Sequence, residues 1–124
     1  MGAKGGLNMN ILSDLNALLS GLGFDVATAV YKDEPPDEYV VVTPTQDRFL
    51  GHADNKPRFE SQGAEISLFT RGSYVDRKDV IVGALMRDRY KIPLRIYQGI
   101  DNDAGLHHYV IGVVKAYGLG AYGA

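Results

Sequence analysis

The run Tyr39-Val40-Val41-Val42-Thr43, closed by Pro44, decides the fold class of this sequence. Its β-branched residues follow one another without interruption, which is typical of a strand buried on both faces of a sheet. Proline cannot donate a hydrogen bond to a neighbouring strand, so Pro44 is expected to end the run. The sequence therefore predicts a central strand at 39–43.

A helix is expected near the N-terminal end. Apolar residues recur at helical spacing from Ile11 onward and form one face of a regular helical repeat. The side chain of Asn10 can cap the first turn, and Gly21 or Gly23 can adopt the left-handed conformation that ends a helix. These signals predict a helix at 11–20.

A further strand and a loop are predicted between this helix and the central strand. Residues 24–31 alternate between two faces with a period of two, as a half-buried strand does. The polar segment 32–38 contains Pro35 and Pro36, neither of which can donate to a sheet. It is therefore expected to be a loop between two strands.

The C-terminal half is predicted to contain three strands and one helix. Between Thr45 and Gln62 the sequence has no periodicity, so we expect a long loop that could dock onto a partner. Beyond it, alternating patterns predict strands, an apolar stripe headed by Asp76 predicts a helix, and Asp, Asn and Gly residues predict a tight turn. These elements are a strand at 64–71, a helix at 76–89, strands at 92–100 and 107–117, and a turn at 101–105.

Together these elements define an α+β fold. The predicted order is α-β-β-β-α-β-β, with a mixed, mostly antiparallel five-stranded sheet and both helices on one face. A chain of 124 residues fits one domain, which we place at 9–117. Residues 1–8 are Gly-rich and are interpreted as a disordered extension or tag, and residues 118–124 as a flexible tail.

Composition excludes several classes of function. The sequence has no cysteine, so thiol nucleophiles and cysteine-ligated metals are absent. A net charge of −2 gives no basic footprint for tight or sequence-specific DNA binding. No apolar run approaches the length needed to span a bilayer, so no membrane association is expected.

No motif in the sequence predicts catalysis or a cofactor. Neither a nucleophile elbow, a Walker loop, a dinucleotide fingerprint nor a zinc-protease motif occurs. His107 and His108 are neighbours on a predicted strand, so they point to opposite faces and cannot share a metal ion. His52 and Asp54 could supply two metal ligands, but the sequence offers no third.

Two groups of residues are candidates for an interface. The acidic run Asp33, Glu34, Asp37 and Glu38, repeated around a ring, would repel DNA phosphates from a channel wall. Tyrosine is favoured at interfaces because it has an apolar body and a polar end. Further candidates are taken from the tyrosines and from the predicted docking loop, namely Tyr74, Tyr97, Tyr109, Tyr117, Arg48, Phe49, His52 and Asp54.

The layout resembles the tail-completion, or head-to-tail joining, proteins of long-tailed bacteriophages. The resemblance spans residues 9–117 and is carried by Tyr39 to Thr43, by Asp47-Arg48 with Ala53-Asp54, and by Gly105-Leu106-His107-His108-Tyr109. It implies a subunit that forms a ring, typically a hexamer, between the head connector and the tail tube. DNA would pass through this ring without sequence-specific binding.

The resemblance also implies a location and leaves alternatives. The subunit would lie in the virion, at the head-tail interface or in the tail, after assembly in the host cytoplasm, and no cofactor is implied. Two other functions remain open from the residues alone. One is a small metal-dependent hydrolase using His52 and Asp54, and the other is a non-viral adaptor domain with the same sheet.

Overall fold

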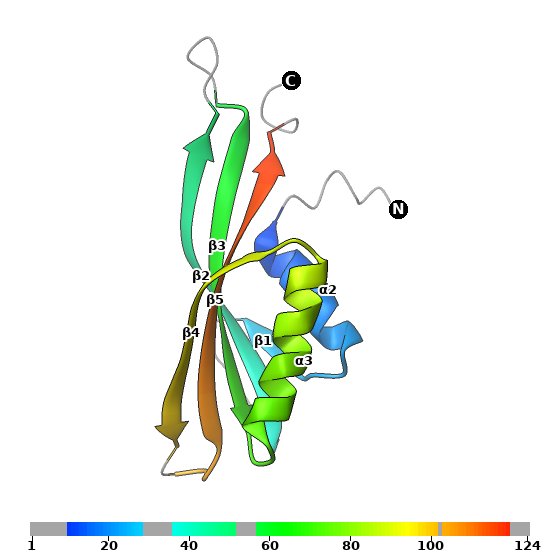
Figure 1. Ribbon diagram of the computed structural model, residues 1–124, viewed down its shortest axis with the longest axis vertical. Helices are drawn as coiled ribbons and strands as arrows, with labels where there is room; N and C mark the ends of the chain where they lie inside the picture. Colours follow the sequence, from blue (N-terminus) through cyan, green and yellow to red (C-terminus); the bar gives the residue numbers. More distant parts are fainter. Residues whose placement is uncertain (1–9, 29–35, 52–56, 102, 120–124) are drawn as a thin grey trace.

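The computed structural model describes residues 10–28, 36–51, 57–101 and 103–119, which contain two helices and five strands (Figure 1). The helices are α2 (Ile11–Gly21) and α3 (Tyr74–Arg87). The strands are β1 (Val26–Thr28), β2 (Glu38–Leu50), β3 (Phe59–Thr70), β4 (Lys91–Ile100) and β5 (His107–Gly118).

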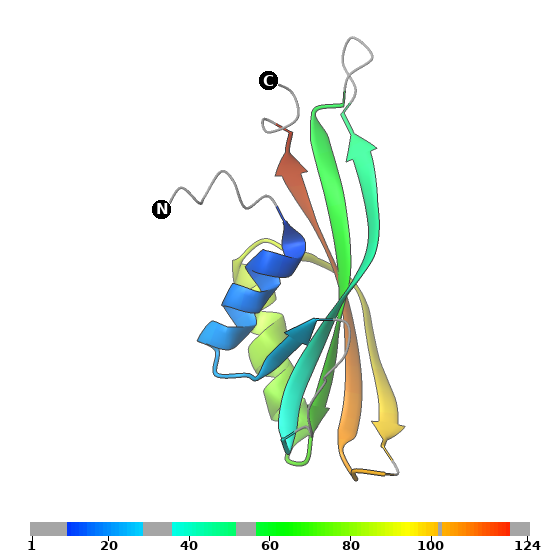
Figure 2. The same cartoon turned by 180° about the vertical axis from the view of Figure 1, so that it is seen from behind.

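The strands form one mixed sheet in the order β1-β2-β3-β5-β4. The pair β1 and β2 is parallel, and every other neighbouring pair is antiparallel. Both helices lie on the same side of the sheet, as the opposite views in Figures 1 and 2 agree. The predicted α+β architecture, with its element order and mostly antiparallel sheet, is therefore confirmed.

Helix α2 begins and ends where the sequence signals place it. The Asn10 side-chain oxygen accepts hydrogen bonds from the backbone N–H groups of Leu12 (2.7 Å) and Ser13 (3.3 Å), two groups that no helical carbonyl can reach. At the other end, Gly23 has φ of +95°, a conformation that suits glycine. The predicted cap and terminator are both confirmed.

Helix α3 starts slightly earlier than predicted. Its cap is Ser73, whose hydroxyl accepts from the Asp76 backbone N–H (3.4 Å), so Asp76 lies in the first turn rather than at the cap. Both residue types cap helices well, and the sequence does not separate the two positions. The acidic side chain is still favourably placed against the positive end of the helix.

The core lies between the helices and one face of the sheet, which we call the covered face. Alternate residues of the central strands point into it, while α2 and α3 present their apolar stripes from the other side. The sheet face without helices is called the open face. Buried core residues include Leu15, Leu19, Val40, Val42, Ile66, Leu68, Ile81, Leu85 and Ile111.

The prediction of a long loop at 45–62 is wrong. Strand β2 continues through Pro44 to Leu50, and β3 begins at Phe59, so most of this segment is a β-hairpin. Pro44 is tolerated because, among the described strands, this part of β2 pairs with β3 alone, and a missing N–H donor costs little in such an edge segment. Thr43 to Leu50 is exposed throughout, which removes the alternation that marks a half-buried strand.

Two other boundaries differ from the predictions. Strand β1 covers Val26–Thr28 only, and residues 29–31 of the predicted strand lie outside the described part of the chain. Strand β5 continues to Gly118, and Leu119 is buried with its N–H donating to the Arg58 carbonyl (3.3 Å). The tail predicted at 118–124 therefore does not begin at 118, while residues 1–8 and 120–124 lie outside the described residues.

Candidate assembly surfaces

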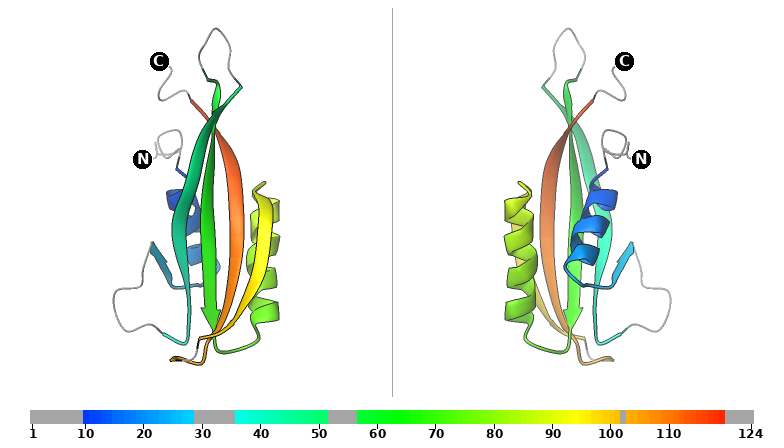
Figure 3. Two further views of the ribbon diagram at one scale, coloured as in Figure 1. Left: turned by 90° about the vertical axis from the view of Figure 1, so that its left-hand side faces the viewer. Right: turned by 90° about the vertical axis from the view of Figure 1, so that its right-hand side faces the viewer.

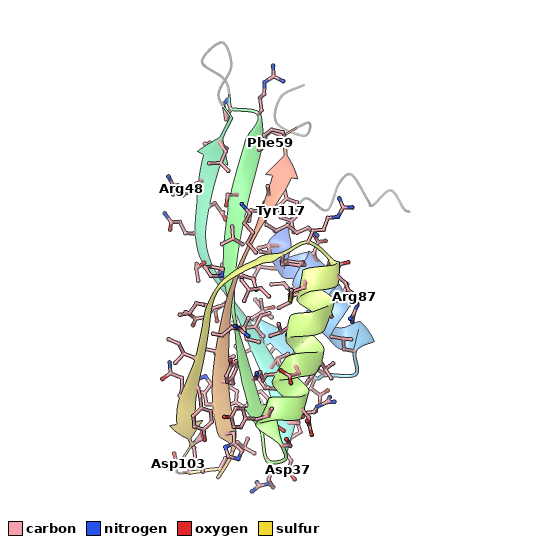
Figure 4. All side chains as sticks on the ribbon, viewed as in Figure 1. Asp37, Arg48, Phe59, Arg87, Asp103 and Tyr117 are labelled. Atoms are coloured by element: carbon pink, nitrogen blue, oxygen red, sulfur yellow. The ribbon has the colours of Figure 1, made fainter. Side chains whose placement is uncertain are left out.

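The end of the β2–β3 hairpin extends past the helix layer, as the ribbon shows from two sides (Figures 1 and 2). We call this extension, residues 43–50 and 59–63, the arm. Phe59 lies on it beyond the ends of both helices, and Arg48 lies on its other strand (Figure 4). The interface candidates Arg48 and Phe49 are both exposed there, Phe49 to 56%. The arm therefore presents apolar and charged groups at one end of the molecule.

Buried polar contacts fix the arm to the start of helix α2. The Ile11 backbone N–H, which has no partner within its own helix, donates to the side-chain oxygen of Gln62 (2.7 Å). Nearby, the Tyr117 hydroxyl donates to a carboxylate oxygen of Asp14 (2.6 Å). Burial, followed by this hydrogen bond, raises the pKa of Tyr117, so the hydroxyl remains a donor at neutral pH. The arm is thus held in a fixed direction relative to the domain.

A β-bulge bends the arm where it leaves the domain. The pairing of β2 with β3 shifts register between Pro44 and Asp47, so Thr45 and Gln46 together lie opposite one residue of β3. They fold over Gly63 on β3. A methyl group at Gly63 would come within 2.6 Å of the Thr45 hydroxyl oxygen and 3.1 Å of the Gln46 carbonyl oxygen.

The substitution Gly63→Ala is expected to lower the free energy of unfolding by about 1–2 kcal/mol, because the added methyl group displaces the bulge. Urea denaturation measures this loss. Gly72→Ala is the matched control, since nothing lies within 4 Å of the added methyl group at that position. Equal stabilities of the two variants would contradict the proposed role of Gly63.

Two edges of the sheet are unpaired within the described residues. Strand β1 pairs only with Val40–Val42, so the segment 43–50 of β2 has no neighbour on the side away from β3. On the opposite side of the sheet, β4 pairs with β5 alone, and most of its residues are exposed. Figure 3 shows these two edges facing away from each other. Unpaired edges of this length are ready to add a strand from another chain.

Of the four candidate tyrosines, Tyr97 and Tyr74 lie near the β4 edge. The Tyr97 ring, 40% exposed, stacks on Tyr74 at 4.6 Å between ring centroids, and its hydroxyl is 2.8 Å from Nδ1 of His107. These two aromatics remain available for an interface.

Tyr109 and Tyr117 were also expected near the surface, and for these two the expectation is wrong. Both are buried, to 8% and 9% exposure, and belong to the main core. They lie on the covered face of β5, beneath the helices, so a single chain does not offer them to a partner.

The acidic run is paired at the two positions that the structure describes. Asp37 forms an ion pair with Arg71 (3.2 Å) at the surface. Glu38 accepts hydrogen bonds from two guanidinium nitrogens of Arg77 (2.9 and 3.1 Å) and from the Thr70 hydroxyl (2.9 Å). These bonds join β2 and α3, which gives Glu38 a structural role rather than an uncompensated charge. Asp33 and Glu34 lie outside the described residues.

Arg77→Ala is expected to cost about 1–2 kcal/mol of stability, because it removes a two-nitrogen pair with Glu38 and a guanidinium packed over the Phe24 ring. In contrast, Arg71→Ala should cost about 0.5 kcal/mol or less, since its partner Asp37 is mostly exposed. Thermal and urea unfolding of both variants measure the difference. A larger loss of stability for Arg71→Ala than for Arg77→Ala would overturn the structural role assigned to the pair of Arg77 and Glu38.

An aromatic stack crosses the open face. Tyr39, Phe69 and His108 lie opposite one another on β2, β3 and β5, with centroid separations of 4.8 and 4.2 Å. His107 instead points to the covered face beside Tyr74, so the prediction that the two histidines face opposite ways is confirmed. The His108 Nε2 atom is buried and has no hydrogen-bond partner among the described residues.

This burial makes His108 the source of an expected pH dependence. Burial lowers the pKa of His108, although Glu65 and Asp101 act in the opposite direction. The unfolded chain then binds the proton more readily, so stability is complete above the unfolded pKa of about 6.5 and falls as the pH drops below it. Urea midpoints between pH 7.5 and 5 should therefore decline less for His108→Phe than for the parent. Identical slopes would contradict this effect.

The described part of the chain contains no cluster of side chains suited to a metal ion. No group of three or more His, Asp or Glu side chains gathers there in an arrangement that could hold a metal ion. His52 and Asp54, the proposed ligands of a hydrolase, lie outside the described residues. Asp103 and Ala104 lie in a turn, as predicted, and the Asp101 carboxylate accepts from the Asp103 N–H (2.9 Å).

Comparison with known proteins adds no relative. No protein-family model matches the chain, and no curated protein sequence matches it. Within the described residues, neither helix has the length and apolar character needed to cross a membrane. The candidate assembly surfaces rest on the structure, and they are the arm and the two unpaired edges of the described strands.

Proposed function

We propose that this chain is a structural subunit of a long-tailed bacteriophage or prophage that assembles as a ring at the head-tail junction or at the end of the tail. It acts by binding copies of itself, the head connector and the tail tube, and DNA passes through the ring without sequence-specific contacts. It carries out no catalysis and needs no cofactor. In the virion it lies at the head-tail interface or in the tail.

One observation carries this proposal: among the described strands, the sheet has unpaired edges on two opposite sides. Two different surfaces that join in head-to-tail fashion make a heterologous contact, and such a contact generates a ring when the rotation between copies closes. The fixed, projecting arm further supports it, because it offers exposed groups beyond the domain to a structure stacked above or below the ring. The overall resemblance to tail-completion proteins adds the place of assembly.

Light scattering coupled to size exclusion tests the ring, over concentrations from low micromolar to several hundred micromolar. We expect a single large species of defined mass, and electron micrographs with round particles that are open at the centre. A monomer at every concentration, or filaments that do not close, would overturn the proposal.

The assignment to a phage is tested separately, by the genes on either side of this one. Genes for a terminase, a portal and a tail-tube protein are expected there. Their absence would refute the phage role while leaving ring formation to the scattering experiment.

A further inference from the structure

We infer that the ring, as proposed above, is held together by sheet pairing between β4 of one copy and the free segment 43–50 of β2 in the next copy. The partner of each unpaired edge is thus the other edge of a second copy. This inference rests on the proposed self-assembly, and it specifies the strands, their direction and their register.

Strand direction favours this pairing. The four strands β2, β3, β5 and β4 alternate in direction across the sheet (Figure 1). When a second copy is placed beside β4 with its β2 adjacent, β4 and the incoming β2 also run antiparallel. The alternation therefore continues from copy to copy without a break, and antiparallel pairing is the more stable arrangement.

The register follows from which part of β2 is free. Within one chain, Arg95 on β4 pairs with Ile111 on β5, and Ile111 pairs with Ile66 on β3. Arg95 and Ile66 therefore lie at the same position along the strand direction. Asp47 lies opposite Gln62 of β3, four residues nearer the arm end than Ile66. Without an offset, β4 would meet the part of β2 that β1 already covers. Side chains alternate along a strand, so only an even offset places covered-face residues of one copy beside covered-face residues of the next.

An offset of four residues moves β4 away from the part of β2 that β1 covers. Because four is even, it also keeps side chains of the same face next to each other. The paired stretches run from Lys91 to Gly99 on one copy and from Leu50 to Thr43 on the next, and each spans seven positions of its own inner neighbour strand. Strand β1 pairs with β2 up to Val42, and the neighbour's β4 would begin its pairing at Thr43. The two strands would thus lie one after the other along the same edge of β2. The resulting pairs are Lys91 with Leu50, Leu94 with Arg48, and Arg95 with Asp47.

The same offset matches the geometry of a closed barrel. Four residues correspond to about 13 Å along a strand, and four strands are about 19 Å wide. This ratio corresponds to a strand tilt of about 35°, which lies in the range that closed barrels adopt. The stagger that frees β2 from β1 is thus also compatible with a closed barrel.

Charge complementarity supports this register. Arg95 and Asp47 both point to the covered face of the sheet, both are exposed, and neither forms an ion pair with any other described residue. In the proposed register they lie directly opposite each other in neighbouring copies. Opposite charges in facing positions stabilise a strand pair, whereas like charges destabilise it.

Two prolines limit which strands can add to these edges. Pro44 and Pro93 each lack a backbone N–H, so a strand added in an arbitrary register would leave carbonyl groups without donors. In the proposed register Pro93 lies in the bulge between Lys91 and Leu94, and Pro44 lies opposite Tyr97. The edges are therefore protected against unspecific pairing while the ladder from Asp47 to Leu50 remains intact.

Charge reversal tests the pairing in the full-length protein. Asp47→Arg and Arg95→Asp should each weaken assembly by about tenfold or more, because each places like charges opposite each other. The double variant, Asp47→Arg with Arg95→Asp, should recover assembly to within about threefold of the parent, since the pair is restored in reverse. Arg87→Glu is the control, because Arg87 lies on α3 and points away from both edges (Figure 4). Circular dichroism checks that each variant is folded.

Cross-linking tests the register itself. The chain has no cysteine, so the pair Arg48→Cys and Leu94→Cys introduces the only thiols. Within one chain these positions are about 19 Å apart, too far for a disulfide, whereas in the proposed register they face each other. Oxidation should give a ladder of covalent oligomers that ends at the closed ring. Arg48→Cys with Met86→Cys, which is exposed on α3, should give none.

The outcomes separate the two proposals. Rescue by the double charge reversal together with the covalent ladder supports the strand pairing. A ring that forms without the ladder, and that is indifferent to all three charge variants, overturns the pairing but leaves the proposed function in place. A parent protein that stays monomeric at every concentration overturns both.

Discussion

Replacing residues 48–61 with Asn-Gly should give a folded monomer that no longer assembles. Asp47 and Gln62 are paired on neighbouring strands, so a two-residue turn of this type can join them and close a shorter hairpin. The change removes the exposed groups at the end of the arm, together with residues 48–50 of the free segment of β2. The core residues of β2 and β3 lie below the deletion and keep their contacts.

The loss of assembly is measured by light scattering, and retention of the fold by circular dichroism and urea unfolding. A control variant replaces only residues 52–56 with a Gly-Ser segment of equal length and keeps both paired strands of the arm. This control should assemble like the parent. Rings formed by the arm-deleted protein would show that the end of the arm, with residues 48–50 of the free edge, is dispensable for assembly.

Leu68→Ala should be the most destabilising single substitution, with a loss of about 3–4 kcal/mol in the free energy of unfolding. Leu68 is fully buried on the covered face of β3 and lies between Val40 and Tyr109 on the neighbouring strands. Truncation removes apolar contacts and leaves a cavity that strands held on both sides cannot close.

Urea denaturation of Leu68→Ala measures this loss. Met86→Ala provides the comparison, because Met86 is 66% exposed on α3 and alanine favours helices. Its effect should stay within about 0.5 kcal/mol. A loss below about 1 kcal/mol for Leu68→Ala would place the core elsewhere.

The order and type of the elements could be predicted because each carries a local pattern. The stripe beginning at Ile11 has the helical period, and the run at Tyr39 to Thr43 has the continuous β-branched character of a buried strand. Tight turns also follow from local chemistry, as at Asp101, whose carboxylate accepts a hydrogen bond from the backbone N–H of Asp103 two residues later. These signals need no knowledge of the rest of the chain.

The arm could not be predicted because its evidence lies in a different strand. Thr43 to Leu50 has no alternation, contains a proline, and is extended because Phe59 to Gly63 returns alongside it. The periodicity of a segment does not reveal which other segment pairs with it. A pattern of exposed polar residues near Pro44 therefore looked like a loop.

The burial and the pairing of individual candidate residues could not be predicted from a local pattern either. The chemistry of tyrosine suits an interface, but neither this nor the alternation of β5 says which residues face the helices, where Tyr109 and Tyr117 are buried. The pairing of Glu38 with Arg77 joins residues far apart in the chain. Both outcomes depend on how the sheet and helices come together.

The position of β3 in the sheet has a consequence for the order in which the protein folds. Its first neighbour, β2, precedes it directly and can form a hairpin as soon as both are synthesised. Its second neighbour is β5, with pairs from Thr70 and His107 to Phe59 and Gly118, so this contact must wait until the last strand leaves the ribosome. Closing such long stretches of chain is slow. During translation one side of β3 is therefore left open, and a nascent chain would be most prone to aggregate in this interval.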